Sequence, residues 1–74
     1  MSEQDKKLDK IRTIGSRIFR KHIREFVEKY PGRRIYINID NEDYAACEDP
    51  LLAYNALARD YPNTIFYTTQ IPSP

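Results

Sequence analysis

The sequence has few of the residues on which most enzymes and metal sites depend. Its 74 residues include one cysteine, one histidine, two glycines and no tryptophan. One cysteine excludes an internal disulfide, and one cysteine with one histidine provides no cluster of metal ligands. Two isolated glycines exclude the glycine-rich loop that holds a phosphate group. We therefore expect a protein that is not an enzyme and has no catalytic residue, cofactor or metal.

Long apolar segments are also missing. No run of residues is long and apolar enough to span a bilayer. The N-terminal Met-Ser-Glu-Gln-Asp lacks the basic start and the apolar stretch of a secretory signal. These observations predict a cytoplasmic protein that does not use a membrane.

The length limits the chain to one domain, residues 1–74, and we expect residues 1–5 and 72–74 to be loose. A chain of this size buries a modest core, and such domains often rely on a disulfide, a metal or a partner subunit. Because the composition excludes the first two, the sequence predicts association with another copy of the same chain.

A helix-to-strand junction organises the rest of the chain. Tyr30-Pro31-Gly32 ends a helical pattern, because proline disfavours helix at the preceding residue and glycine accepts the left-handed conformation that follows many helices. Tyr61-Pro62-Asn63 repeats the junction, with asparagine as the next most tolerant residue at positive φ. The sequence therefore predicts two helices that each end at a Tyr-Pro pair and lead into a strand.

The first helix is expected over residues 6–30, and it is long for so small a domain. At helical periodicity its apolar stripe includes Leu8, Ile11, Ile14, Gly15 and Ile18. A helix of about 25 residues is about 37 Å long, whereas a six-residue strand covers only about 20 Å. We therefore expect these five residues to form a self-association surface, unless the helix breaks at Gly15-Ser16.

The remaining elements predict an α+β fold of order α-β-β-α-β. Strands are expected over residues 33–39, 44–47 and 64–71, and the helix that starts at Asp49-Pro50 lies between the last two. The simplest topology is a three-stranded antiparallel sheet of order 2-1-3 with both helices packed on one face. Tyr36 would then lie on the other face, which we expect to bind a partner if it is apolar and uncovered.

Five segments between Phe26 and Pro72 carry a resemblance to a known family. They are Tyr30-Pro31-Gly32-Arg33, Ile35-Tyr36-Ile37, Asp40-Asn41-Glu42, Leu51-Leu52 and Ile65-Phe66-Tyr67. In this order they resemble a family of short uncharacterised bacterial and archaeal domains. The family has no assigned activity, so the resemblance implies the topology and no site residue. The small-residue segment Tyr44-Ala45-Ala46-Cys47 departs from the family pattern, and residues 1–25 lie outside the resemblance.

Charge is divided unevenly between the two halves of the chain. Residues 1–34 hold eleven Lys/Arg against five Asp/Glu, a net of +6, and residues 35–74 hold one against six, a net of −5. The basic face of the first helix includes Arg17, Arg20, Lys21 and Arg24, which could bind the phosphates of a nucleic acid. The ordinary alternative is a solvated helix face, or one paired with the acidic half of the chain.

Two weaker patterns have ordinary explanations. His22 with Cys47 would need to meet, and to gain a third group, to form a nucleophilic site. Asp40-Asn41-Glu42-Asp43 resembles a turn more than a cation loop, since it lacks the glycine and the distal glutamate. The sequence therefore predicts a small non-enzymatic protein–protein interaction or regulatory module, homodimeric through its N-terminal helix. The alternative is a nucleic-acid-binding regulator that uses the basic face.

Overall fold

A computed structural model describes residues 3–73 of the chain, with side chains described from residue 6. The elements are α1 (Glu3–Lys21), α2 (Ile23–Lys29), β1 (Arg34–Ile37), β2 (Tyr44–Cys47), α3 (Pro50–Asp60) and β3 (Tyr67–Gln70). Residues 3–5 lie at the start of α1, and the expectation that residues 3–5, 72 and 73 are loose stays a prediction. The expectation for residues 1–2 and 74 lies outside the described part.

The three strands form one antiparallel sheet in the order β2-β1-β3, which confirms the predicted α+β class and topology. Ile35 and Ile37 alternate with Tyr36 along β1, and both isoleucines are fully buried. Strand side chains alternate between the two faces of a sheet. Tyr36 therefore faces away from the two isoleucines, together with Ala45 of β2 and Thr68 of β3, which are its register partners.

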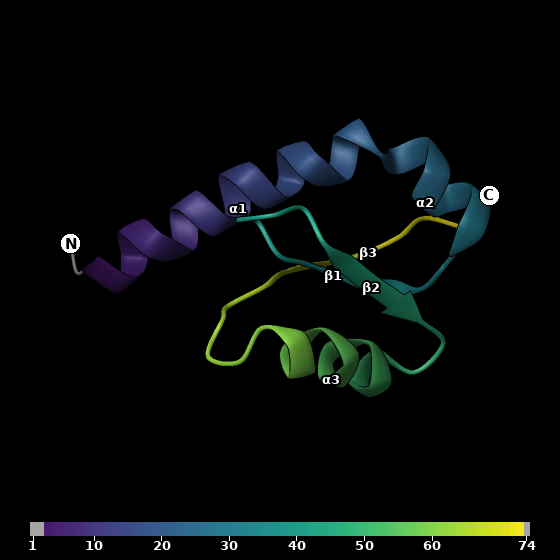
Figure 1. Cartoon of the computed structure of the whole chain (residues 1–74). Coiled ribbons are helices and arrows are strands. Elements are labelled where there is room, and N and C mark those ends of the chain that lie inside the picture. The colour runs from purple at the N-terminus through teal and green to yellow at the C-terminus, as the bar shows by residue number, and fades with distance from the viewer. Residues whose placement is uncertain (1–2, 74) are drawn as a thin grey trace.

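The helices lie on both faces of the sheet, which corrects the prediction that they share one face. In Figure 1, α1 and α2 lie on one side of the strands and α3 on the other. The ring of Tyr54 in α3 packs edge-on against Tyr36, with centroids 5.5 Å apart. Because α1 and α2 already cover the isoleucine face, the buried side of α3 (Ala53 and Leu57) packs on the face of Tyr36.

The main core lies between the sheet and the first two helices. It consists of Ile18, Phe26, Ile35, Ile37 and Ile71. Phe26 is fully buried and is surrounded by aromatic rings, with Phe19 at 5.8 Å and Tyr44 at 4.9 Å between centroids. Aromatic pairs at such distances add to the free energy gained from burial. This cluster joins both helices to the sheet.

The first helical segment breaks at His22 and continues unbroken through Gly15-Ser16, which was the alternative site for a break. His22 adopts φ −112° and ψ 17° and separates α1 from α2. Gly15 is buried because α1 crosses β3 there. A Cβ atom added to Gly15 would lie 2.2 Å from the ring of Tyr67. The glycine therefore permits a close helix-to-sheet contact within one chain.

The two Tyr-Pro junctions have the expected conformations. Gly32 has φ +74° and Asn63 has φ +62°, so both residues occupy the left-handed region after a helix. Asp49 caps α3, since its side chain accepts a hydrogen bond of 2.9 Å from the N–H of Leu51. Local turn chemistry therefore sets the ends of α2 and α3 as predicted.

Candidate functional site

The outer side of α1 and α2 carries a dense group of basic side chains. Between residues 6 and 24 the chain has eight Lys/Arg and one acid, Asp9, a net of +7. All eight basic residues are exposed, because the opposite side of α1 is buried at Ile11, Gly15 and Ile18. We call this set the basic face, and it consists of Lys6, Lys7, Lys10, Arg12, Arg17, Arg20, Lys21 and Arg24.

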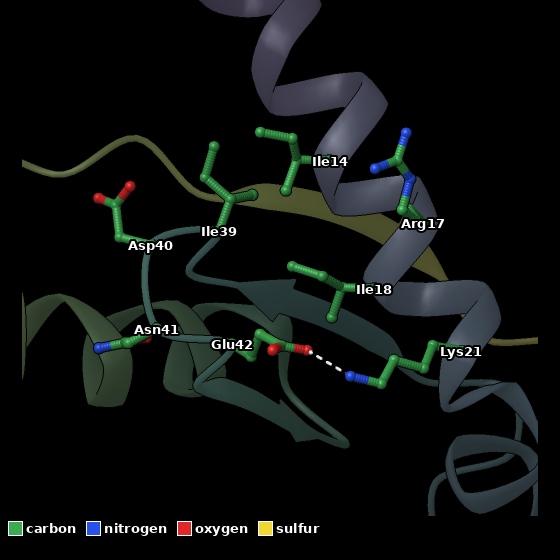
Figure 2. A pocket seen from close by; sticks show the side chains of 8 residues that line it. All are labelled: Ile14, Arg17, Ile18, Lys21, Ile39, Asp40, Asn41 and Glu42. Carbon is green, nitrogen blue, oxygen red and sulfur yellow. Dashed lines mark hydrogen bonds and ion pairs between the residues drawn. The ribbon is translucent and has the colours of Figure 1, made fainter.

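A groove of about 310 Å³ runs beside the basic face (Figure 2). Ile14, Ile18 and Ile39 form its apolar part. Arg17 and Lys21 of α1 lie along one side, and the loop between β1 and β2 forms the other. That loop contributes Asp40, Asn41 and Glu42. The groove therefore has basic side chains on the α1 side and two carboxylates on the loop side.

One ion pair connects the two sides of the groove. Lys21 Nζ donates to Glu42 Oε1 at 3.4 Å, as the dashed line in Figure 2 shows. His22 Nε2 lies 3.8 Å from the same oxygen. Among ion pairs between residues 6 and 73, Lys21 is the one member of the basic face that takes part. The acidic half of the chain thus neutralises the basic face only at its C-terminal end.

The position of Glu42 is fixed by the structure of its loop. Its φ of 64° is left-handed, and its N–H donates to the carbonyl of Asn38 at 2.8 Å. Asn38 is buried, and its N–H donates to the carbonyl of Asp43 at 2.7 Å. The hydroxyl of Tyr61 donates to the Asp43 carboxylate, which raises the pKa of that tyrosine. The loop is therefore attached to the ends of both α1 and α3.

Another ion pair lies on α2, outside the basic face. Lys29 Nζ donates to Glu25 Oε1 at 2.9 Å. The hydrogen bond and the charge of Lys29 lower the pKa of Glu25, and the same contact raises the pKa of Lys29. Lys29 is therefore already paired, unlike the arginines that precede it.

The structure places the five residues predicted for self-association mostly inside the molecule. Ile11 and Ile18 are buried, Gly15 contacts Tyr67, and Ile14 packs on the core. Leu8 alone remains open, with 48% of its surface exposed. The loops before β2 and β3 extend the surface against which α1 packs. Ile11 of α1 lines a pocket together with Ile39 of the first loop and Ile65 of the second. The sheet and its loops therefore cover most of the stripe that seemed too long for one domain.

The sixth residue of that prediction, Tyr36, lies beneath α3. It is half-buried, and its ring contacts Tyr54, which in turn packs against Phe66. The face that the sequence left open is therefore covered by a helix of the same chain.

The two residues considered for nucleophilic chemistry make separate contacts. His22 lies near Glu25, Glu42 and the ring of Phe26. Cys47 is half-buried at the end of β2, and its thiol donates to the carbonyl of Asp49 at 3.0 Å. Within the described residues no group of three acidic, histidine or cysteine side chains is placed to hold a metal ion.

Sequence reasoning missed an exposed apolar pair on α3. Leu51 is 64% exposed and Leu52 is 62% exposed. The helix is instead buried through Ala53 and Leu57. Ala45 of β2 shares this face of the sheet, and small side chains on both elements allow close packing. Only the side-chain sizes on the facing strand could have indicated which side of α3 packs against the sheet.

Comparisons with known proteins give no further assignment. No family model matches the chain, and no curated protein or solved structure matches it either. The resemblance to short uncharacterised domains stays a prediction. None of the helices within residues 3–73 has the length and hydropathy needed to cross a membrane. The cellular location also stays a prediction.

Proposed function

We propose that the protein is a small non-enzymatic binding module that attaches to the phosphate backbone of a nucleic acid through the basic face. The observation that carries this proposal is the net charge of +7 over residues 6–24, with all eight basic side chains exposed. Backbone phosphates require positive charge at suitable spacing and little else. The packing of Ile11, Ile14 and Ile18 in their own domain leaves this function better supported than self-association through them.

The arrangement favours phosphate contacts over recognition of bases. Domains that recognise bases through a β-sheet present exposed aromatic rings on which the bases stack. Here the strand aromatics pack within the domain, with Tyr36 against Tyr54 and Tyr44 against Phe26 and Tyr30. Seven of the eight basic residues lie instead along α1, a helix of 19 residues that is about 28 Å long, and Arg24 lies on α2. Binding should therefore depend strongly on salt and weakly on sequence.

The test is a titration of fluorescently labelled 20-base-pair duplex DNA and of single-stranded RNA, followed by anisotropy from 50 to 300 mM salt. The test variant is Arg17→Gln/Arg20→Gln/Arg24→Gln, which keeps Lys21 because that residue pairs with Glu42. For duplex DNA we expect the slope of log K against log salt to become shallower by as much as about 2.7, or about 0.9 per lost contact.

The matched control removes three positive charges elsewhere, as Lys29→Gln/Arg33→Gln/Arg59→Gln. These exposed residues lie outside the basic face. The control should keep the slope of the unchanged protein. Equal losses in both variants would show that only net charge matters. Absence of binding to either probe at 50 mM salt would also contradict the proposal.

A second candidate is the protein–protein interaction or regulatory module expected first from the sequence. The observation that favours it is the exposed pair Leu51 and Leu52 on α3. Exposed apolar side chains that adjoin each other are common at binding surfaces. Leu51→Ser/Leu52→Ser should then remove a protein partner captured from native lysate after nuclease treatment. The same variant should leave binding to nucleic acid unchanged, which separates the two candidates.

A further inference from the structure

The outer edge of β3 is unpaired within the described residues. β3 has one neighbour, β1, and Thr68 and Gln70 are exposed. The N–H of Ile71 donates to the carbonyl of Arg33 at 2.8 Å. Antiparallel ladders alternate, so Thr69 and Tyr67 also direct their backbone groups toward β1. The backbone N–H and C=O groups of Thr68 and Gln70 therefore point outward from the sheet, and Phe66, directly before β3, has the same place in the alternation.

β3 is only four residues long, but it lacks the charged side chains that usually protect an edge strand against pairing. Proteins commonly place charged residues, especially lysine, on edge strands to prevent association. Residues 64–73, Thr-Ile-Phe-Tyr-Thr-Thr-Gln-Ile-Pro-Ser, contain no charged residue. Tyrosine, threonine, phenylalanine and isoleucine are also the types that favour strands. The segment is thus suited to receive another strand along its outer side.

The other edge of the sheet, along β2, differs in charge. β2 is preceded by Asp43 and followed by Glu48 and Asp49. If two copies of β2 paired antiparallel about Ala46, whose backbone groups point away from β1, Asp43 of each copy would lie opposite Asp49 of the other. Like charges directly opposite each other destabilise a strand pair. Self-pairing is therefore disfavoured at β2 and not at β3.

We propose that a second copy of the chain pairs with β3 in antiparallel orientation, with Thr68 opposite Thr68 of the second copy. This register makes the residues with outward backbone groups coincide, since Phe66 then lies opposite Gln70 of the other copy. Each such pair exchanges two backbone hydrogen bonds, which gives about six in all. The result is one six-stranded sheet, and the symmetric contact closes as a dimer.

The dimer places both copies of α1 on the same side of the joined sheet. The two-fold axis is perpendicular to the sheet, so equivalent faces of the copies stay together. Gly15 of α1 contacts Tyr67 of β3, so α1 crosses the strand that forms the interface. Two basic faces would therefore lie side by side above one sheet. This inference does not depend on the proposed function, because it concerns the strand edge alone.

The first test is Thr68→Pro, followed by sedimentation equilibrium. Proline has no N–H, and it is tolerated on edge strands where that group faces solvent. The substitution removes both hydrogen bonds at the centre of the dimer and leaves the ladder with β1. We expect the unchanged protein to dimerise and the variant to raise the dimer dissociation constant at least tenfold. The control is Asn55→Ser, an exposed substitution on α3 away from the β3 edge.

The second test remains valid if Thr68→Pro fails to fold. Thr68→Cys is made with Cys47→Ser and oxidised with glutathione. Opposed residues in a hydrogen-bonded pair have Cα atoms about 5.5 Å apart, within the range that a disulfide spans. We expect a disulfide-linked dimer, and none for Asn55→Cys in the same background. A protein that is monomeric at millimolar concentration, or equal cross-linking at positions 55 and 68, would overturn the proposal.

Discussion

Gly15 is the residue at which α1 comes closest to the sheet. Its own helix would be more stable with alanine there, by about 1 kcal/mol. The ring of Tyr67 occupies the space that a Cβ atom would need, at 2.2 to 2.6 Å. Packing at this position therefore outweighs helix propensity.

We predict that Gly15→Ala lowers the free energy of unfolding by about 1 to 3 kcal/mol, because the added methyl group forces α1 away from Tyr67. Urea denaturation followed by circular dichroism measures the change. Thr13→Ala is the control, since Thr13 is exposed on the same helix and should be neutral or slightly stabilising. An unchanged midpoint for Gly15→Ala would mean that the close contact does not constrain the fold.

At the scale of elements, α3 depends on the chemistry of its first turn. The Asp49 side chain accepts the hydrogen bond from the Leu51 N–H at 2.9 Å, and Pro50 follows as the first helical residue. A capping side chain satisfies a backbone N–H that has no partner within the helix.

Asp49→Ala should therefore lower the free energy of unfolding by about 1 kcal/mol, within a range of 0.5 to 2. Asp49→Asn keeps the acceptor oxygen and should recover most of this loss. Both values come from the same urea titration. If Asn and Ala at this position were equally destabilising, the negative charge would matter more than the hydrogen bond.

The order and type of the elements could be predicted from the sequence because local patterns decide them. β2 lies at the expected residues 44–47, and α3 begins at Pro50 as the Asp-Pro pair indicates. The strands β1 and β3 are shorter than expected, since each was predicted from apolar alternation that continues into loops. The Tyr-Pro junctions were predictable for the same local reason.

The placement of the helices could not be predicted in this way. The contact between Gly15 and Tyr67 joins residues far apart in the sequence, and nothing near Gly15 indicates it. The break at His22 and the covering of Tyr36 by α3 also depend on packing between distant elements. The basic face was recognised as a candidate from charge alone, but its exposure required the structure.

For the molecule as a whole, the two proposals predict opposite responses to salt. Binding to nucleic acid should weaken as salt rises, because phosphate contacts release counterions. Dimer formation should strengthen instead, because it brings together two basic faces, each within a segment of net charge +7 (residues 6–24). Arg34, which donates to Thr68 Oγ1 at 3.2 Å, adds a like charge near the interface of each copy.

We expect the dimer dissociation constant to fall between 50 and 500 mM sodium chloride, as screening shortens the Debye length from about 14 Å to about 4 Å. Sedimentation equilibrium at several salt concentrations measures this change. A dimer that weakens with salt would indicate contact between a basic face and an acidic loop, in place of strand pairing.

The central position of β1 has a consequence for how the molecule opens. This strand has a strand on each side, α1 and α2 above one face and α3 above the other. Solvent can reach its amides only when several of these neighbours separate together. Local fluctuations would therefore not exchange the amide protons of Ile35 and Ile37 for deuterium. Their exchange should occur only through global unfolding, so its rate would report the stability of the entire domain.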